Sequence, residues 1–189
     1  GAAAELWLRS GRTLSRLTRL PRADWGKAAA HAGLGVTFVG VAAMTAWSVE
    51  DIRTIKIGDT FPIGPFEVTL TSVDQGEGPN YLTTMATMHV RQNGKEIAVL
   101  YPEKRVYPVA KMPTTEAAIQ QGLFRDIYLV LGDKQDDGGW AVRSYVKPFA
   151  NWIWAGALMM AFGGALSLSD RRLRIAAGAR RTPVTAPAE

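Results

Sequence analysis

Two histidines, His31 and His89, are the residues whose types first suggest metal ligation or proton transfer. His31 lies in an uncharged run of 22 residues, Ala28 to Val49, which is long enough to cross a hydrocarbon core as a helix. An ionisable group inside such a helix is costly and needs a partner. The residues alone leave four roles open for His31: a neutral ring bonded to a neighbouring helix, a ligand to a metal or haem iron, a proton relay, or a contact to a quinone.

His89 lies in a stretch that alternates apolar and polar residues, which predicts a β-strand. On such a strand His89 would face away from Met88 and Val90, towards solvent. The segment around it, residues 50–147, contains no second histidine. A surface role is therefore the preferred interpretation, with ligation shared with another chain as the alternative.

The acidic residues form no recognisable catalytic set. Asp136 and Asp137 lie in a turn sequence, where aspartate is favoured for backbone reasons. The chain has no cysteine, which excludes thiol nucleophiles, disulfides and covalent haem attachment through a CxxCH motif. Serine-hydrolase, zinc-protease, P-loop and dinucleotide-binding motifs are also missing. We assign no catalytic residue and do not expect the chain by itself to be a complete enzyme.

A second uncharged run, Pro148 to Ser169, has the same length as the first. Gly33 and Gly40 in the first run would let other helices approach closely, and tryptophans at the ends of both runs suit membrane interfaces. The predicted organisation is a basic leader over 1–27, a transmembrane helix over 28–49, an exported β-rich domain over 50–147, a second transmembrane helix over 148–169, and a basic tail over 170–189 that is disordered at its end.

The charge distribution predicts the topology. The leader carries a net charge of +4, the middle domain −2 and the tail +3. Positive flanks place both termini in the cytoplasm and the middle domain outside, in the periplasm of a bacterium or its topological equivalent. In a bacterium the helices would cross the inner membrane. The basic flanks are explained by topology and by contact with the lipid bilayer, and no motif points to a nucleic acid. The first residue is Gly and no signal peptide precedes the first run, so we expect a longer polypeptide.

Residues 50–147 are predicted to form short antiparallel strands. Period-two alternation over 66–70 is typical of a half-buried strand, and Asn93-Gly94 favours a type I′ hairpin. Pro113 followed by threonines predicts one short helix from Thr115 to Gly122. Further strands are predicted over 81–91, 96–101, 125–131 and 140–146. The expected fold is a small antiparallel barrel or sandwich with one short helix, flanked by two transmembrane helices.

Several sequence blocks lie in order between about residues 25 and 174. They include Trp25-Gly26-Lys27, Ala30-His31-Ala32-Gly33-Leu34-Gly35, Glu103-Lys104-Arg105-Val106-Tyr107, Met112-Pro113-Thr114-Thr115-Glu116 and Tyr145-Val146-Lys147-Pro148-Phe149. Through these blocks the chain resembles the C-terminal part of the CcmF family of cytochrome c maturation proteins.

The resemblance implies a multi-span membrane protein that acts as a haem lyase, attaching haem to apocytochrome c at the outer face. It implies partners: a haem chaperone and a subunit that presents the apocytochrome. It also implies a haem b held between two membrane histidines, the second of which His31 matches by position. His31 would then be an axial ligand to the haem iron, and the other ligand would come from the remainder of the same protein or a companion subunit. The family's tryptophan-rich motif and two outer-face histidines do not occur in this chain.

Three hypotheses follow. In the first, the chain handles haem through His31, and its exported domain delivers haem or docks a partner. In the second, the chain is a structural assembly module with no haem ligand of its own. In the third, His31 relays protons in a transporter, although neither uncharged run carries the carboxylates that such a relay would use.

Overall fold

The computed structural model describes residues 2–10, 20–109 and 111–170. It divides into a helical unit, within residues 1–39 and 152–189, and a β unit, residues 40–151, which are described separately. Part of the predicted leader, with Arg12, Arg16 and Arg19, lies outside the described residues. So does the tail from Arg171 onwards, including its predicted disordered end.

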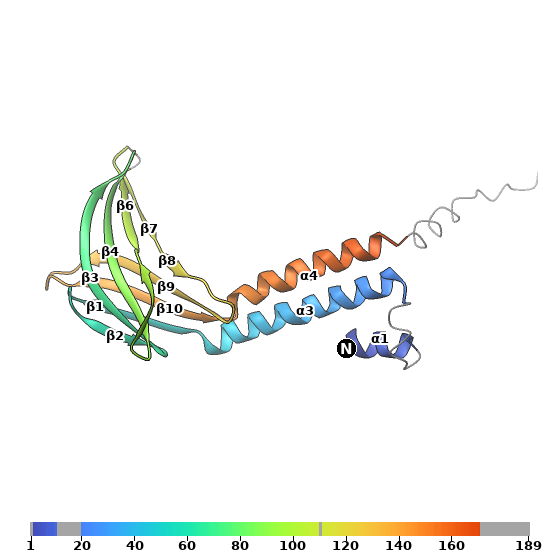
Figure 1. The fold of residues 1–189 in the computed structure, drawn as a ribbon. Helices are drawn as coiled ribbons and strands as arrows, with labels where there is room; N and C mark the ends of the chain where they lie inside the picture. The colour runs from blue at the N-terminus through green and yellow to red at the C-terminus, as the bar shows by residue number, and fades with distance from the viewer. Residues whose placement is uncertain (1, 11–19, 110, 171–189) are drawn as a thin grey trace, which may run out of the picture. The chain divides into compact units, whose positions relative to one another are not determined.

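Three helices are described: α1 (Ala2–Arg9), α3 (Arg22–Trp47) and α4 (Ala150–Leu168) (Figure 1). Helices α3 and α4 are long and apolar enough to cross a membrane, as judged by length and composition. The carbonyl of Pro21 accepts hydrogen bonds from the backbone N–H groups of Asp24 and Trp25 at the start of α3. Asp24 also lies in the first turn, where a carboxylate complements the helix dipole.

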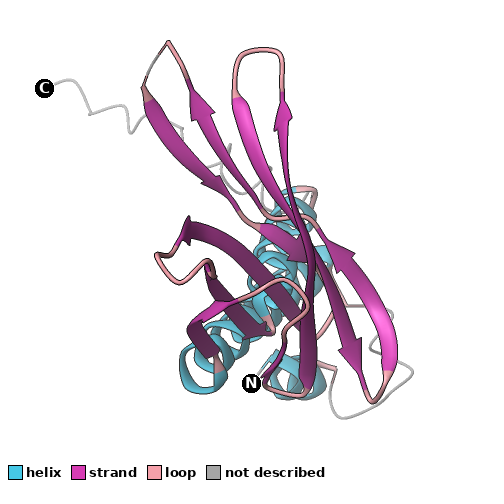
Figure 2. Ribbon diagram, turned by 90° about the vertical axis from the view of Figure 1, so that its left-hand side faces the viewer, coloured by secondary structure: helices cyan, strands magenta, loops and turns pink. Residues whose placement is uncertain are grey.

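The β unit consists of two antiparallel sheets (Figure 2). Sheet one has the strand order β1-β10-β9-β8, and sheet two has the order β2-β3-β4-β6-β7 with β5 paired to β4. The strands are β1 (Val49–Ile55), β2 (Thr60–Ile63), β3 (Phe66–Glu77), β4 (Leu82–Gln92), β5 (Lys95–Leu100), β6 (Glu103–Tyr107), β7 (Met112–Glu116), β8 (Ala118–Gln120), β9 (Arg125–Lys134) and β10 (Trp140–Pro148).

The core lies between the two sheets and is filled by alternate residues of their strands. Sheet two contributes Phe66, Val68 and Leu70 of β3, all fully buried, as the alternation predicted. Sheet one contributes Leu129 and Leu131 of β9 in the same way. The predicted hairpin at Asn93-Gly94 is confirmed, because both residues have positive φ, 52° and 76°, as a type I′ turn requires.

The predicted short helix from Thr115 to Gly122 is wrong. This stretch holds the end of β7 and all of β8: Thr115 pairs with Lys104 of β6, and Ile119 pairs with Tyr128 of β9. The β-branched threonines favour an extended backbone. Pairing with strands distant in the sequence then decides the conformation, and that pairing leaves no local signal.

A buried carboxylate, Asp126, ties the start of β9 to the end of the β unit. Its side chain is 2% exposed. Asp126 Oδ1 accepts hydrogen bonds from the backbone N–H of Gly122 at 2.9 Å and from Asn151 Nδ2 at 3.1 Å. Asn151 Nδ2 also donates to the Gly122 carbonyl at 2.8 Å. The three residues form a closed polar cluster inside the unit.

Candidate functional site

Helices α3 and α4 approach each other at glycines, and Gly33 is one of them, as predicted. A methyl group on Gly33 of α3 would lie 2.6 Å from the carbonyl oxygen of Gly156 on α4. One on Gly163 of α4 would lie 2.6 Å from the carbonyl oxygen of Gly26 on α3. The glycines of each helix are seven residues apart, so they lie on one face. Backbone therefore meets backbone along this interface.

Two polar contacts fix the alignment of the paired helices. Asp170, which follows α4, accepts a hydrogen bond at 3.1 Å from the backbone N–H of Ala23 in the first turn of α3. A carboxylate at this position satisfies a free N–H group and complements the helix dipole. Further along, Thr37 Oγ1 donates to the carbonyl of Ile153 at 3.5 Å.

The imidazole of His31 has one of its two nitrogens engaged. Its Nδ1 lies 2.7 Å from the carbonyl oxygen of Lys27, one turn earlier in α3. A carbonyl oxygen can only accept, so Nδ1 carries the proton and donates it to this bond. Nε2 then keeps its lone pair, and no hydrogen bond from another described residue reaches it. His31 is thus held in the tautomer that can ligate a metal through Nε2.

His31 lies on an exposed, apolar face of α3. Leu34, Gly35, Phe38 and Ala42 follow His31 at the spacing of one helical face, and they are exposed as well, Phe38 to 65%. Among the described residues, no group of three or more His, Cys, Asp or Glu side chains could hold a metal ion. A metal at His31 would therefore need its other ligands from a cofactor or from outside the described residues. A haem fits these conditions, because its porphyrin supplies four ligands and its faces are apolar.

His89 lies on β4 with its side chain opposite to those of Met88 and Val90, which are fully buried. Its Nδ1 is 2.6 Å from Glu96 Oε2 on the neighbouring strand β5. The carboxylate on the neighbouring strand explains why the imidazole lies here. The two side chains form a cross-strand pair at the surface of sheet two.

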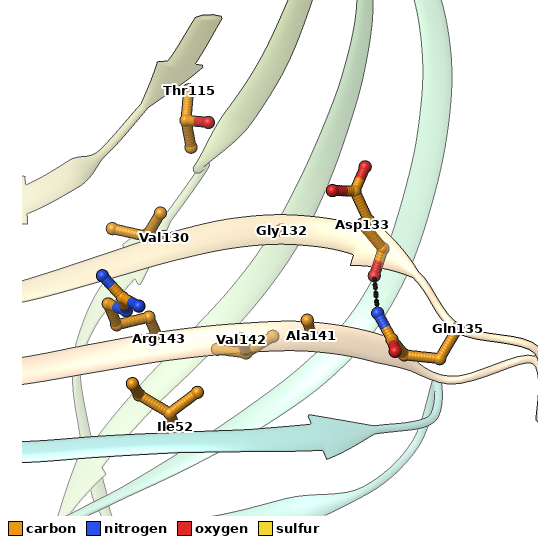
Figure 3. Close-up of a pocket in the computed structure, with 9 residues that line it drawn as sticks. All are labelled: Ile52, Thr115, Val130, Gly132, Asp133, Gln135, Ala141, Val142 and Arg143. Carbon is orange, nitrogen blue, oxygen red and sulfur yellow. Dashed lines mark hydrogen bonds between the residues drawn. The ribbon is translucent and has the colours of Figure 1, made fainter.

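The β unit also carries a pocket of about 430 Å³ on the outer side of sheet one (Figure 3). Ile52, Arg143 and Val130 lie in register on β1, β10 and β9 and line it side by side. Thr115 of β7 also borders it, and Gln135 Nε2 donates to the carbonyl of Asp133 at its rim, at 3.1 Å. Sequence reasoning missed this pocket because it depends on the register of three strands.

Arg105 of β6 anchors a polar and aromatic cluster in sheet two. Its Nε donates to Glu103 Oε2 at 2.9 Å, and its guanidinium lies 4.6 Å from the ring centroid of Tyr81. The ring of Tyr107 is 5.7 Å from that of Tyr81. The hydrogen bond from Arg105 holds the pKa of Glu103 below its usual value. Glu103, Arg105 and Tyr107 belong to one of the blocks that carry the family resemblance.

Comparisons with known proteins agree on one family. The family model described as the CcmF C-terminal beta-sandwich matches residues 46–148. The cytochrome c-type biogenesis protein ccl1 of Rhodobacter capsulatus is 63% identical over 184 residues, covering 97% of this chain and 28% of that protein. The cytochrome c-type biogenesis protein CcmF of Escherichia coli is 47% identical over 173 residues, covering 92% of this chain and 26% of that protein.

A solved structure, the cytochrome c haem lyase CcmF, has the same fold, with a TM-score of 0.71 at 16% identity. The match covers 89% of this chain and 28% of that one. The chain thus spans little more than a quarter of the length of the relatives it matches. Because the family model matches more than half of its residues, this chain belongs to the CcmF family and carries that family's C-terminal β-sandwich.

Proposed function

We propose that this chain works in cytochrome c maturation as the C-terminal segment of a membrane haem lyase, in which His31 is one axial ligand of a haem b. The second axial ligand would come from outside this chain. The observation that carries the proposal is the bond from His31 Nδ1 to the Lys27 carbonyl, which leaves Nε2 for the iron. When bound, haem b would supply one-electron chemistry, which the family resemblance links to reduction of the incoming haem.

We further propose that α3 and α4 cross a bacterial inner membrane, with both termini in the cytoplasm and the β unit in the periplasm. The two apolar helices and the positive charge of both flanking segments support this placement. The glycine-lined contact between the helices suits lipid, where close van der Waals packing replaces the hydrophobic effect as the force of association.

The proposed task of the β unit is to dock the haem chaperone or the apocytochrome-presenting subunit. The pocket over Ile52, Val130 and Arg143 supports this task, because it combines apolar surface with a guanidinium. Arg143 forms an ion pair with Glu50, whose Oε1 lies 3.9 Å from Arg143 Nε, and its side chain is 53% exposed. A pair this exposed and this long is weak, so a carboxylate of a partner can replace Glu50.

Replacing His31 by alanine in the complete protein tests the haem ligand. We expect the haem content per protein to fall about 10-fold or more, because even loss of an outer-shell partner of a metal ligand costs 10- to 100-fold in affinity. The absorption and paramagnetic resonance spectra of the purified protein would lose the signature of two histidine ligands. Adding imidazole to a His31→Gly variant should restore part of that signature.

The control is His89→Ala, which removes the other histidine of the chain and leaves α3 unchanged. It should retain normal haem content and spectra. If His31→Ala also keeps both, His31 is not a ligand, and the chain is better described as a structural assembly module of the membrane complex. That module would lose association with partner proteins when the β unit is deleted, and would keep its haem.

Site-specific photocrosslinking tests the docking surface. A photoreactive residue at Ile52 should form a crosslink with the haem chaperone or the apocytochrome-presenting subunit in membranes. The same residue at Thr60, which is exposed on β2 of the other sheet, serves as the control. Equal crosslinking at the two positions, or none at Ile52, would remove the pocket from consideration.

A further inference from the structure

Glycine is unfavourable inside a helix, so each glycine of α3 and α4 calls for a physical reason. Gly26, Gly33, Gly156 and Gly163 have one, because a side chain at any of them would collide with the opposite helix. Gly35 and Gly164 have none: a methyl group built on either meets no described atom within 4 Å beyond its own stretch of helix. Of these two, only Gly35 lies on the helix that carries His31, and no described residue accounts for a glycine there.

Position 35 lies one helical turn after His31, on the same face of α3. A turn of helix rises about 5.4 Å, so the two Cα atoms are close neighbours along the surface. Side chains on a helix lean towards its N-terminus, and any side chain at position 35 would lean over the surface next to the His31 ring. Leu34 and Phe38, both exposed, border the same surface.

We propose that Gly35 leaves the surface of α3 bare so that the flat porphyrin ligated by His31 can lie directly against the helix backbone. The inference rests on the proposed haem function and assigns Gly35 as a positioning residue for that haem. It accounts for a glycine at which an added methyl group would meet open space and which lies one turn from an imidazole whose Nε2 is free to ligate. A lipid chain or another helix at this position is the competing occupant.

The test is Gly35→Leu in the complete protein, with Gly164→Leu as the matched control. Gly164 lies on α4, and its missing side chain also faces open space. For Gly35→Leu we expect haem content to fall about 10-fold or the spectrum to change from two histidine ligands to one. Gly164→Leu should keep normal haem content and spectrum, and both variants should keep the helical circular dichroism of the parent.

His31→Ala, measured in parallel, separates this inference from the proposed function. If His31→Ala loses haem while Gly35→Leu keeps normal haem content and spectrum, the inference is overturned and the haem ligand stands. If His31→Ala keeps its haem, the proposed function itself fails. An equal loss of haem in Gly164→Leu would also overturn the inference, because the effect would then not be specific to the His31 face.

Gly35→Ala decides the question if the leucine variant does not accumulate. Alanine favours the helix more than glycine does, so on an open face this change should preserve or raise the melting temperature of the haem-free protein. A fall in haem content at an unchanged or higher melting temperature supports a porphyrin against this surface. An unchanged haem content and spectrum overturns it.

Discussion

Gly156→Ala is expected to destabilise the helix pair, although alanine is the better helix former. In an isolated helix the change would stabilise by about 1 kcal/mol. Here the new methyl group would collide with Thr37 Oγ1 and would lie 2.5 Å from the carbonyl oxygen of Gly33. Such overpacking typically lowers the free energy of unfolding by about 1–3 kcal/mol. We expect about 3 kcal/mol here, because the methyl group would meet backbone atoms, which cannot rotate away as a side chain can. Thermal melting of the helical circular dichroism signal in detergent measures the change.

Gly164→Ala provides the matched comparison on the same helix. Its methyl group meets no described atom within 4 Å, so only the helix propensity changes and the melting temperature should rise or stay constant. The two substitutions are chemically identical, and opposite signs are expected from them. A shift of the same sign in both would show that α3 and α4 do not pack through their glycines.

The second large effect is expected for Asp126→Ala in the β unit. The change removes the buried acceptor of the backbone N–H of Gly122 and of one N–H of the Asn151 side chain, two residues that are themselves half-buried. Breaking a buried charged group's hydrogen bonds in this way costs about 3 kcal/mol. The loss of stability should appear as faster hydrogen–deuterium exchange at residues 122–129 and as a lower melting temperature of the β-sheet circular dichroism signal.

Asp126→Asn separates the acceptor role of the side chain from its charge. The asparagine oxygen can still accept from Gly122 and Asn151, so most of the stability should remain. If alanine and asparagine destabilise equally, charge on Asp126 matters and its acceptor geometry does not. If neither destabilises, the cluster does not stabilise the β unit.

Sequence patterns predicted the elements whose conformation is determined by residues close together in the chain. The period-two alternation at Phe66 to Leu70 located part of β3, and Asn93-Gly94 fixed the hairpin between β4 and β5. His31, Leu34 and Phe38 follow one another at intervals of three and four residues, the spacing of one helical face, and all three are exposed on α3. Glycine content indicated close helix packing before any partner helix was known.

Contacts between distant residues were not predictable in this way. Thr115 follows a proline and resembles a helix cap, but its pairing with Lys104 of β6 makes it part of a strand. Asp170 follows the end of α4, and its carboxylate also accepts a hydrogen bond from the backbone N–H of Ala23 in the first turn of α3. The two residues are 147 positions apart in the sequence. The bond from His31 to Lys27 is local, and an i to i−4 donor–acceptor check along the helix would have found it.

The first and last strands of the β-sandwich, β1 and β10, are partners, with Val49 opposite Val146. The polypeptide therefore enters and leaves the sandwich at adjacent points, which is the arrangement of a domain inserted into a pre-existing loop. Such a cassette can change its loops, its pockets and its binding partners during evolution without moving the ends to which it is joined.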